Sequence, residues 1–231
     1  MYSRPPFQID RSSALAFAQA RGFGLVCTFD DRKPIASSLP FHMSYASNGT
    51  PRIAFHVARS NPLAVRADGK THWLLAIAGS DAYVSPDWYA SPHQVPTWLY
   101  QSVHVSGPVW PMTGGELLSH LDDLSANFEQ ELAPKPIWRA DAMPPGRLKD
   151  MARAVTGLVM YVEDVEASFK LNQHKSDADH VAVTQALAVQ KNDGARDIAR
   201  QLRAQRPGLF NDETAGDTGG KMMELQEGDL P

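Results

Sequence analysis

Extended segments separated by short turns are the feature that most constrains the fold of this chain. In residues 52–58, RIAFHVA, bulky apolar side chains alternate with Ala and His, which is the period of a half-buried β-strand. Residues 23–29 and 35–43 are joined by DDRKP and predict a hairpin. Further β segments are expected at 72–85, 97–110 and 157–171. Because few helices interrupt this series, the sequence predicts a mainly β (α+β) fold with peripheral helices, an antiparallel barrel rather than a doubly wound α/β sheet.

Helix signals frame the β segments. Asp10 precedes an amphipathic stretch, and Thr113 is followed by Glu116 at the spacing of a capping box. A short helix is expected within 144–155, and a C-terminal helical region is expected to begin at Ser176. We therefore expect a barrel domain at 1–175, a helical appendage packed on the barrel at 176–206, and a tail at 207–231.

Charge supports this division and limits the possible partners. The chain has 231 residues, of which 43% are hydrophobic and 21% charged, so it can bury one sizeable core. Residues 207–231 hold six acidic residues and one Lys, a net charge of −5, which leaves +1 of the total of −4 for the remaining chain. This Gly-rich, aperiodic tail is predicted to be disordered. The net charge of −4 argues against a protein whose whole surface binds nucleic acid.

Several classes of site are excluded by what the sequence lacks. The single Cys27 rules out a disulfide scaffold and a thiolate metal centre, and a buried, inert thiol is expected. The eight His residues form no ligand pattern, so no metal is expected. No Walker-type loop, dinucleotide glycine motif or nucleophile elbow is present. The chain has no apolar run long enough for a membrane span and no secretory h-region, so a cytoplasmic protein without a membrane partner is expected.

An aromatic segment at 83–100, YVSPDWYASPHQVPTWLY, is the most unusual part of the sequence. Its prolines oppose helix and central strand, whereas its rings require something to pack against. The candidates are the core of the protein, a second subunit or a flat aromatic ligand.

Five segments together carry a family resemblance. They are LPFHM (39–43), FHVARSNP (55–62), AYVSPDWY (82–89), VPTWLYQSVHVSG (95–107) and FKLNQHKSDAD (169–179). In order and spacing they resemble the FMN-binding negative transcriptional regulators, the PaiB-type family, over about Met1 to Arg206. The resemblance implies an FMN-binding split β-barrel that forms a homodimer with FMN at the subunit interface. It also implies a role that some members have in repressing genes for sporulation or protease production.

The residues of these segments suit the parts of FMN. A phosphate dianion is best bound by a guanidinium fork and neutral donors, and the flavin ring by aromatic side chains. The alternatives are a surface salt bridge for Arg59, a solvated strand position for Lys170 and a purely structural role for the rings. The expected cofactor-binding residues are Ser37, Ser38, His56, Arg59, Ser60, Asn61, Tyr83, Ser85, Trp88, Tyr89, Thr97, Trp98, Lys170 and Asn172.

Three positions depart from the family pattern. Leu99 replaces an amide residue, and Asn172 and His174 stand in the segment where the family has KLSQN. These departures leave weak or absent FMN binding open.

Three functions are compatible with these features. The first is an FMN-binding regulatory protein that responds to flavin or to a small-molecule signal and has no catalytic residue. The second is an FMN-dependent oxidoreductase, in which Tyr83, His56 or His104 would be the residues to test. The third is direct DNA binding through the arginine stripe formed by Arg196, Arg200 and Arg203.

Overall fold

The structure is a computed structural model that describes residues 1 and 3–210. Most of the predicted acidic tail, 211–231, lies outside the described residues. Packing divides the chain into two compact units, each described by itself below. The first unit comprises Met1–Ser80 and Tyr100–Gln173, and the second comprises Asp81–Leu99 and the described residues from His174 on.

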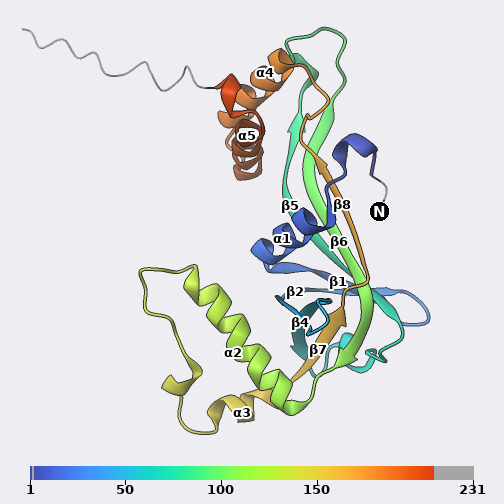
Figure 1. Ribbon diagram of the computed structural model, residues 1–231, viewed down its shortest axis with the longest axis vertical. Coiled ribbons are helices and arrows are strands. Elements are labelled where there is room, and N and C mark those ends of the chain that lie inside the picture. Colours follow the sequence, from blue (N-terminus) through green and yellow to red (C-terminus); the bar gives the residue numbers. More distant parts are fainter. Residues whose placement is uncertain (2, 211–231) are drawn as a thin grey trace, which may run out of the picture. The chain divides into compact units, whose positions relative to one another are not determined.

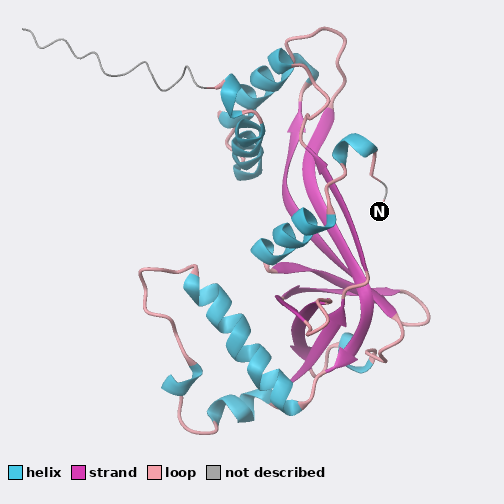
Figure 2. Ribbon diagram, viewed as in Figure 1, coloured by secondary structure: helices cyan, strands magenta, loops and turns pink. Residues whose placement is uncertain are grey.

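The elements follow one another as shown in Figures 1 and 2. The first unit contains η1 (Pro5–Phe7), α1 (Arg11–Arg21), β1 (Phe23–Phe29), β2 (Pro34–Pro40), β3 (His42–Tyr45), β4 (Pro51–Ala58), η2 (Pro62–Val65), α2 (Gly114–Gln130), η4 (Ala140–Ala142), α3 (Arg147–Ala152), β7 (Val155–Tyr161) and β8 (Asp164–Lys170). The second unit contains η3 (Pro86–Trp88), α4 (Asp177–Ala188), α5 (Asp193–Gln205) and η5 (Pro207–Leu209). The long strands β5 (His72–Val84) and β6 (Thr97–Pro111) contribute residues to both units.

The sheet has the strand order β2-β1-β5-β6-β7-β4-β3, and β8 pairs with β6. Strand β6 is antiparallel to β8 from Tyr100 to Ser106 and antiparallel to β7 from Val109 to Pro111. Gly107 lies between these two pairings, and a Cβ atom there would be 1.8 Å from the carbonyl oxygen of Tyr161. Only glycine allows β6 to change partner at this point, because any side chain would overlap the neighbouring backbone.

The core of the first unit lies inside the curved sheet. Side chains alternate along β4, so that Ile53, Phe55 and Val57 are buried in the core. Trp73 of β5 and Met160 of β7 belong to the same cluster. The prediction of an antiparallel, mainly β fold with peripheral helices is confirmed.

One strand boundary was predicted wrongly. Residues 35–43 form two strands, β2 and β3, because Phe41 leaves the ladder between them. The Phe41 N–H donates to the Gly22 carbonyl at 2.8 Å, and its side chain is buried in the core. Strand β3 therefore pairs with β4 instead of continuing the hairpin with β1.

The predicted helix starts are confirmed by their capping bonds. The Asp10 carboxylate accepts from the Ser13 N–H, and the Thr113 hydroxyl accepts from the Glu116 N–H. In α1 the buried residues Ala14, Leu15 and Ala18 face the core. Helix α2 contacts β3, β4 and β7, and the short α3 contacts α2 and β7.

The second unit is built around the pair of helices α4 and α5. The Ser176 hydroxyl caps α4 as predicted by accepting from the Asp179 N–H. His180 Nε2 lies 2.9 Å from the Leu202 carbonyl oxygen, which connects α4 to α5. The buried side chains of Leu187, Ile198 and Leu202 complete this small core.

Candidate functional site

The predicted binding residues are divided between the two units. The first unit holds Ser37, Ser38, His56, Arg59, Ser60, Asn61, Lys170 and Asn172. The second unit holds Tyr83, Ser85, Trp88, Tyr89, Thr97 and Trp98.

Ser37 and Ser38 of β2 point to opposite faces of the sheet. Ser37 pairs with the buried Val26, and its hydroxyl accepts from Asn61 Nδ2 at 2.9 Å. Ser38 pairs with Leu25, whose side chain is exposed on the outer face. Because strand side chains alternate, these two serines cannot contact a ligand on the same face of the sheet.

Arg59 and Ser60 stand exposed in the turn that follows β4. Asn61 holds this turn in place, because its side chain accepts from the Leu63 N–H at 2.9 Å and donates to Ser37. The Arg59 N–H donates to the Ala154 carbonyl at 2.9 Å, and its Nε donates to the Arg153 carbonyl at 3.0 Å. Within the described residues, the two terminal guanidinium nitrogens of Arg59 have no acceptor. The arginine is thus oriented by backbone, with its outer edge available to an anion.

His56 faces α2 rather than the core or open solvent. Its Nδ1 lies 3.1 Å from Nε2 of His120, a buried residue of α2 with 4% exposure. Nδ1 of His120 is buried and has no partner among the described residues. Burial lowers the pKa of His56, and burial followed by the nearby His56 and His42 lowers the pKa of His120 to about 4.

This histidine pair was not visible in the sequence, where His56 and His120 lie on a strand and a helix that are far apart along the chain. A neutral pair can share one proton, and the tautomer that carries it on His120 Nε2 leaves only a lone pair at the buried Nδ1. Within residues 1 and 3–210, no group of three or more His, Cys, Asp or Glu could hold a metal ion.

Lys170 and Asn172 lie at the end of β8. Lys170 is half-buried and pairs with Tyr100 of β6. Asn172 has a φ of 61°, in the left-handed region, where Asn is better tolerated than most residues. Its side chain is 1% exposed, and its Nδ2 has no partner among the described residues. A buried amide without an acceptor is costly, so Asn172 is an unusual position.

The aromatic segment exposes two of its rings and buries a third. Tyr83 and Trp98 meet edge to face with ring centroids 6.1 Å apart, and both remain about half exposed. Tyr89 is buried, and the Lys175 ammonium lies 4.7 Å from the centroid of its ring. Ser85 caps η3, in which Trp88 is half-buried, and the half-buried Thr97 begins β6.

The same segment is bonded to α4 through Asp179, a residue that was not among the expected site residues. The buried Asp179 carboxylate accepts from the Ser91 N–H at 2.8 Å and from the Ser91 hydroxyl. Gln94 Nε2 donates to the Ser91 hydroxyl, and Lys175 Nζ donates to Gln94 Oε1 at 2.6 Å. Burial alone would raise the pKa of Asp179, but the bonds from Ser91 and Ser176 and the charge of Lys175 outweigh it and lower the pKa.

The structure shows the environment of two of the departures from the family pattern, Leu99 and His174. Leu99 is fully buried, so its apolar side chain suits its position in β6. His174 is exposed.

Cys27 is partly exposed on β1, whereas a buried thiol was expected. Its partial burial raises the pKa of the thiol.

The described residues fit the chemical groups of FMN. The first unit offers the outer edge of Arg59 for a phosphate and the buried Nδ2 of Asn172 as an unused donor. The second unit exposes the rings of Tyr83 and Trp98, which suit a flat aromatic group.

No helix among the described residues is long and apolar enough to cross a membrane.

Comparison with known proteins agrees with this chemistry. Residues 1–164 match the family model described as "Putative FMN-binding domain". The chain is 30% identical over 203 residues to "Protease synthase and sporulation protein PAI 2" of Bacillus subtilis, covering 87% of this chain and 96% of that protein.

Solved structures show the fold. The FAD and heme binding protein of Mycobacterium smegmatis has a TM-score of 0.51 at 14% identity, over 71% of this chain and 73% of its own. A conserved hypothetical protein of Mycobacterium tuberculosis has a TM-score of 0.53 at 10% identity, over 76% of this chain and 94% of its own. With the sheet described above, these similarities identify a split β-barrel with C-terminal helices. The chain therefore belongs to the PaiB-type family of proteins with an FMN-binding domain.

Proposed function

We propose that this protein binds FMN and acts as a homodimeric regulatory protein, with the flavin or a small molecule as its signal. The observation that carries the proposal is the turn after β4, where Asn61 is fixed by Ser37 and Arg59 is oriented by two backbone carbonyl groups. This arrangement presents a guanidinium edge and the Ser60 hydroxyl to a phosphate without further rearrangement. The similarity to the B. subtilis sporulation protein supports the regulatory role.

Flavin binding is tested by an absorbance scan of the gently purified protein, followed by titration of the flavin-free protein with FMN. We expect one FMN per chain. Arg59→Ala should weaken FMN binding by about tenfold or more, because charge-assisted hydrogen bonds contribute about 1.5–3 kcal/mol. Arg32→Ala, in the exposed turn between β1 and β2, is the matched control and should leave the affinity unchanged. A wild-type protein that binds no FMN at saturating concentration would refute the flavin function.

An exposed apolar face on β1 supports the homodimer. Phe23, Leu25 and Phe29 are 51%, 41% and 53% exposed and lie on the same face of the strand, opposite to the buried Val26. The outward face of β5 continues this surface, because Ala76 pairs with Leu25. Contiguous apolar surface of this kind is typical of protein interfaces.

The dimer is tested by analytical ultracentrifugation. Leu25→Glu places a charge in the apolar face and should produce monomers at concentrations where the wild type is dimeric. Val189→Glu changes another exposed apolar residue, which is 80% exposed, and should leave the association state unchanged. If Leu25→Glu sediments as the wild type does, β1 is not the dimer interface.

No specific observation favours either alternative function. For DNA binding, Arg196 pairs with Asp193 and Arg200 pairs with Asp197, so acidic partners offset most of the basic stripe. For an oxidoreductase, Nδ1 of His56 is engaged by His120, so this nitrogen is not open to a substrate.

A further inference from the structure

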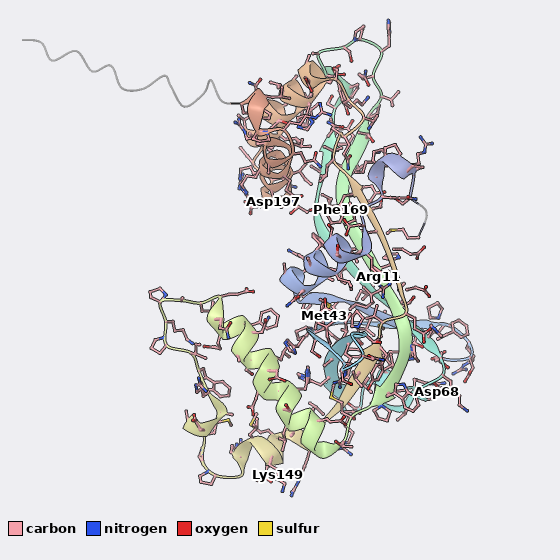
Figure 3. The ribbon with its side chains drawn as sticks, in the orientation of Figure 1. Arg11, Met43, Asp68, Lys149, Phe169 and Asp197 are labelled. Atoms are coloured by element: carbon pink, nitrogen blue, oxygen red, sulfur yellow. The ribbon has the colours of Figure 1, made fainter. Side chains whose placement is uncertain are left out.

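Three cationic side chains line one hollow on the first unit. The hollow has a volume of about 380 Å³ and lies between the end of β4, the short α3 and the first turn of α2. Its cations are Arg59, Lys149 and Arg153. Figure 3 labels Lys149 on α3. No acidic residue is part of its lining, so the hollow carries an excess of positive charge.

Most of this charge is not neutralised within the described residues. The Arg59 side chain donates only through its Nε, and Lys149 has no acceptor in the part of the chain that the structure describes. Arg153 has one ion pair, with Asp150 at 3.5 Å, and this pair is largely exposed. Like charges gathered in one hollow repel one another, and an anion bound between them offsets this repulsion. The arrangement is therefore suited to an anionic ligand.

The other lining residues suit the same ligand. Gly114 and Gly115 are the first residues of α2, and a Cβ atom at either position would meet nothing within 4 Å. Neither crowding nor a positive φ explains these poor helix formers. Their N–H groups belong to the first turn and have no acceptor within the helix. Leu117 and Ala152 add an apolar wall, which excludes water from one side and strengthens electrostatic attraction.

We infer that this hollow binds the phosphate group of FMN, so that Lys149 and Arg153 complete the phosphate site that Arg59 begins. The inference rests on the proposed function and adds two residues from a segment that carries none of the family motifs. A phosphate monoester is a compact dianion whose oxygens can be shared among a guanidinium fork, an ammonium group and backbone N–H groups.

The test compares FMN with riboflavin, which differs from it only by the phosphate. Dissociation constants for both are measured by flavin fluorescence titration of the wild type, Lys149→Gln and Arg153→Gln. We expect each variant to lose about tenfold in FMN affinity, the size of one charge-assisted contact, with unchanged riboflavin affinity. Lys70→Gln, at an exposed lysine outside the hollow, is the matched control and should change neither constant.

Gly115→Ala provides a separate variant that should fold at least as well as the wild type, because alanine is the better helix former. We expect it to weaken FMN binding in the same titration, because its Cβ atom would occupy space at the lining of the hollow. The thermal midpoint of the flavin-free protein should not fall. Inorganic phosphate should compete with FMN in the wild type and more weakly in Lys149→Gln.

The outcomes separate the two proposals. If the wild type binds neither flavin, the proposed flavin function fails and this inference fails with it. If the wild type binds FMN but Lys149→Gln and Arg153→Gln keep the wild-type ratio of FMN to riboflavin affinity, the hollow is not the phosphate site and the proposed function stands. Equal affinity of the wild type for the two flavins would also overturn the inference.

Discussion

The buried pair of His56 and His120 predicts that the stability of the first unit falls in mild acid. His120 titrates near 6.5 in an unfolded chain, whereas in the fold its pKa is about 4. The unfolded state therefore binds more protons between these values, so the free energy of unfolding decreases as the pH falls below about 6.5. The decrease is complete below about pH 4, where both states are protonated, and it amounts to about 3 kcal/mol.

Replacing His120 by Gln isolates this effect. Gln does not titrate, and its amide can still donate to Nδ1 of His56. Substitution should cost some stability near neutral pH, and this cost should become about 2 kcal/mol smaller at about pH 5, where most of the wild-type penalty is present. His56, whose pKa is also lowered by burial, retains its own dependence of the same sign in both proteins.

The assay is urea unfolding followed by far-UV circular dichroism at about pH 7.5 and about pH 5. The free energies of unfolding of the two proteins are compared at each pH, because the contribution of the carboxylates that titrate in both proteins then cancels. Hydrogen exchange of the α2 amides reports whether the loss is local to this helix. His72→Gln is a control of opposite sign, since the bond to Glu163 raises the pKa of this exposed histidine and its contribution is lost as the pH rises. An equal cost of His120→Gln at both pH values would refute the argument.

Three further predictions concern the framework of the two units. Asp179→Ala should lower the free energy of unfolding by about 1–3 kcal/mol, because it leaves the Ser91 donors without an acceptor, and it should raise amide exchange in residues 83–100. Gly107→Ala should destabilise the first unit by about 3 kcal/mol in urea unfolding, because its Cβ atom would overlap the Tyr161 carbonyl oxygen. Thr113→Ala removes the capping box of α2 and should cost about 1 kcal/mol in urea unfolding and raise amide exchange in α2. Thr71→Ala, outside any helix cap, is the control and should leave amide exchange in α2 unchanged.

Local patterns were sufficient for most helices and strands of the fold. The alternation in residues 52–58 predicted β4, and the pair Thr113 and Glu116 predicted the start of α2, because both depend on side chains a few positions apart. The end of β2 at Pro40 was missed, since it depends on a backbone bond from Phe41 to Gly22 and on the burial of the Phe41 ring.

In the candidate site, too, some features could be predicted from the sequence and others required the structure. The motif segments predicted Arg59 and Asn61 as binding residues from their residue types. Similarity over nearly the whole chain identified the family. The opposed orientation of Ser37 and Ser38 follows from strand alternation once the strand has been located.

The sequence by itself determined the β-rich architecture, the main helix caps and the family, because these depend on short periods and motif order. Only the tertiary structure decided that His56 meets His120, that Asp179 holds Ser91, and that Lys149 joins Arg59 at one hollow. Each of these pairs is separated by many residues along the chain. Their contact depends on strand pairing and helix packing over the whole unit, which no local pattern of side chains records.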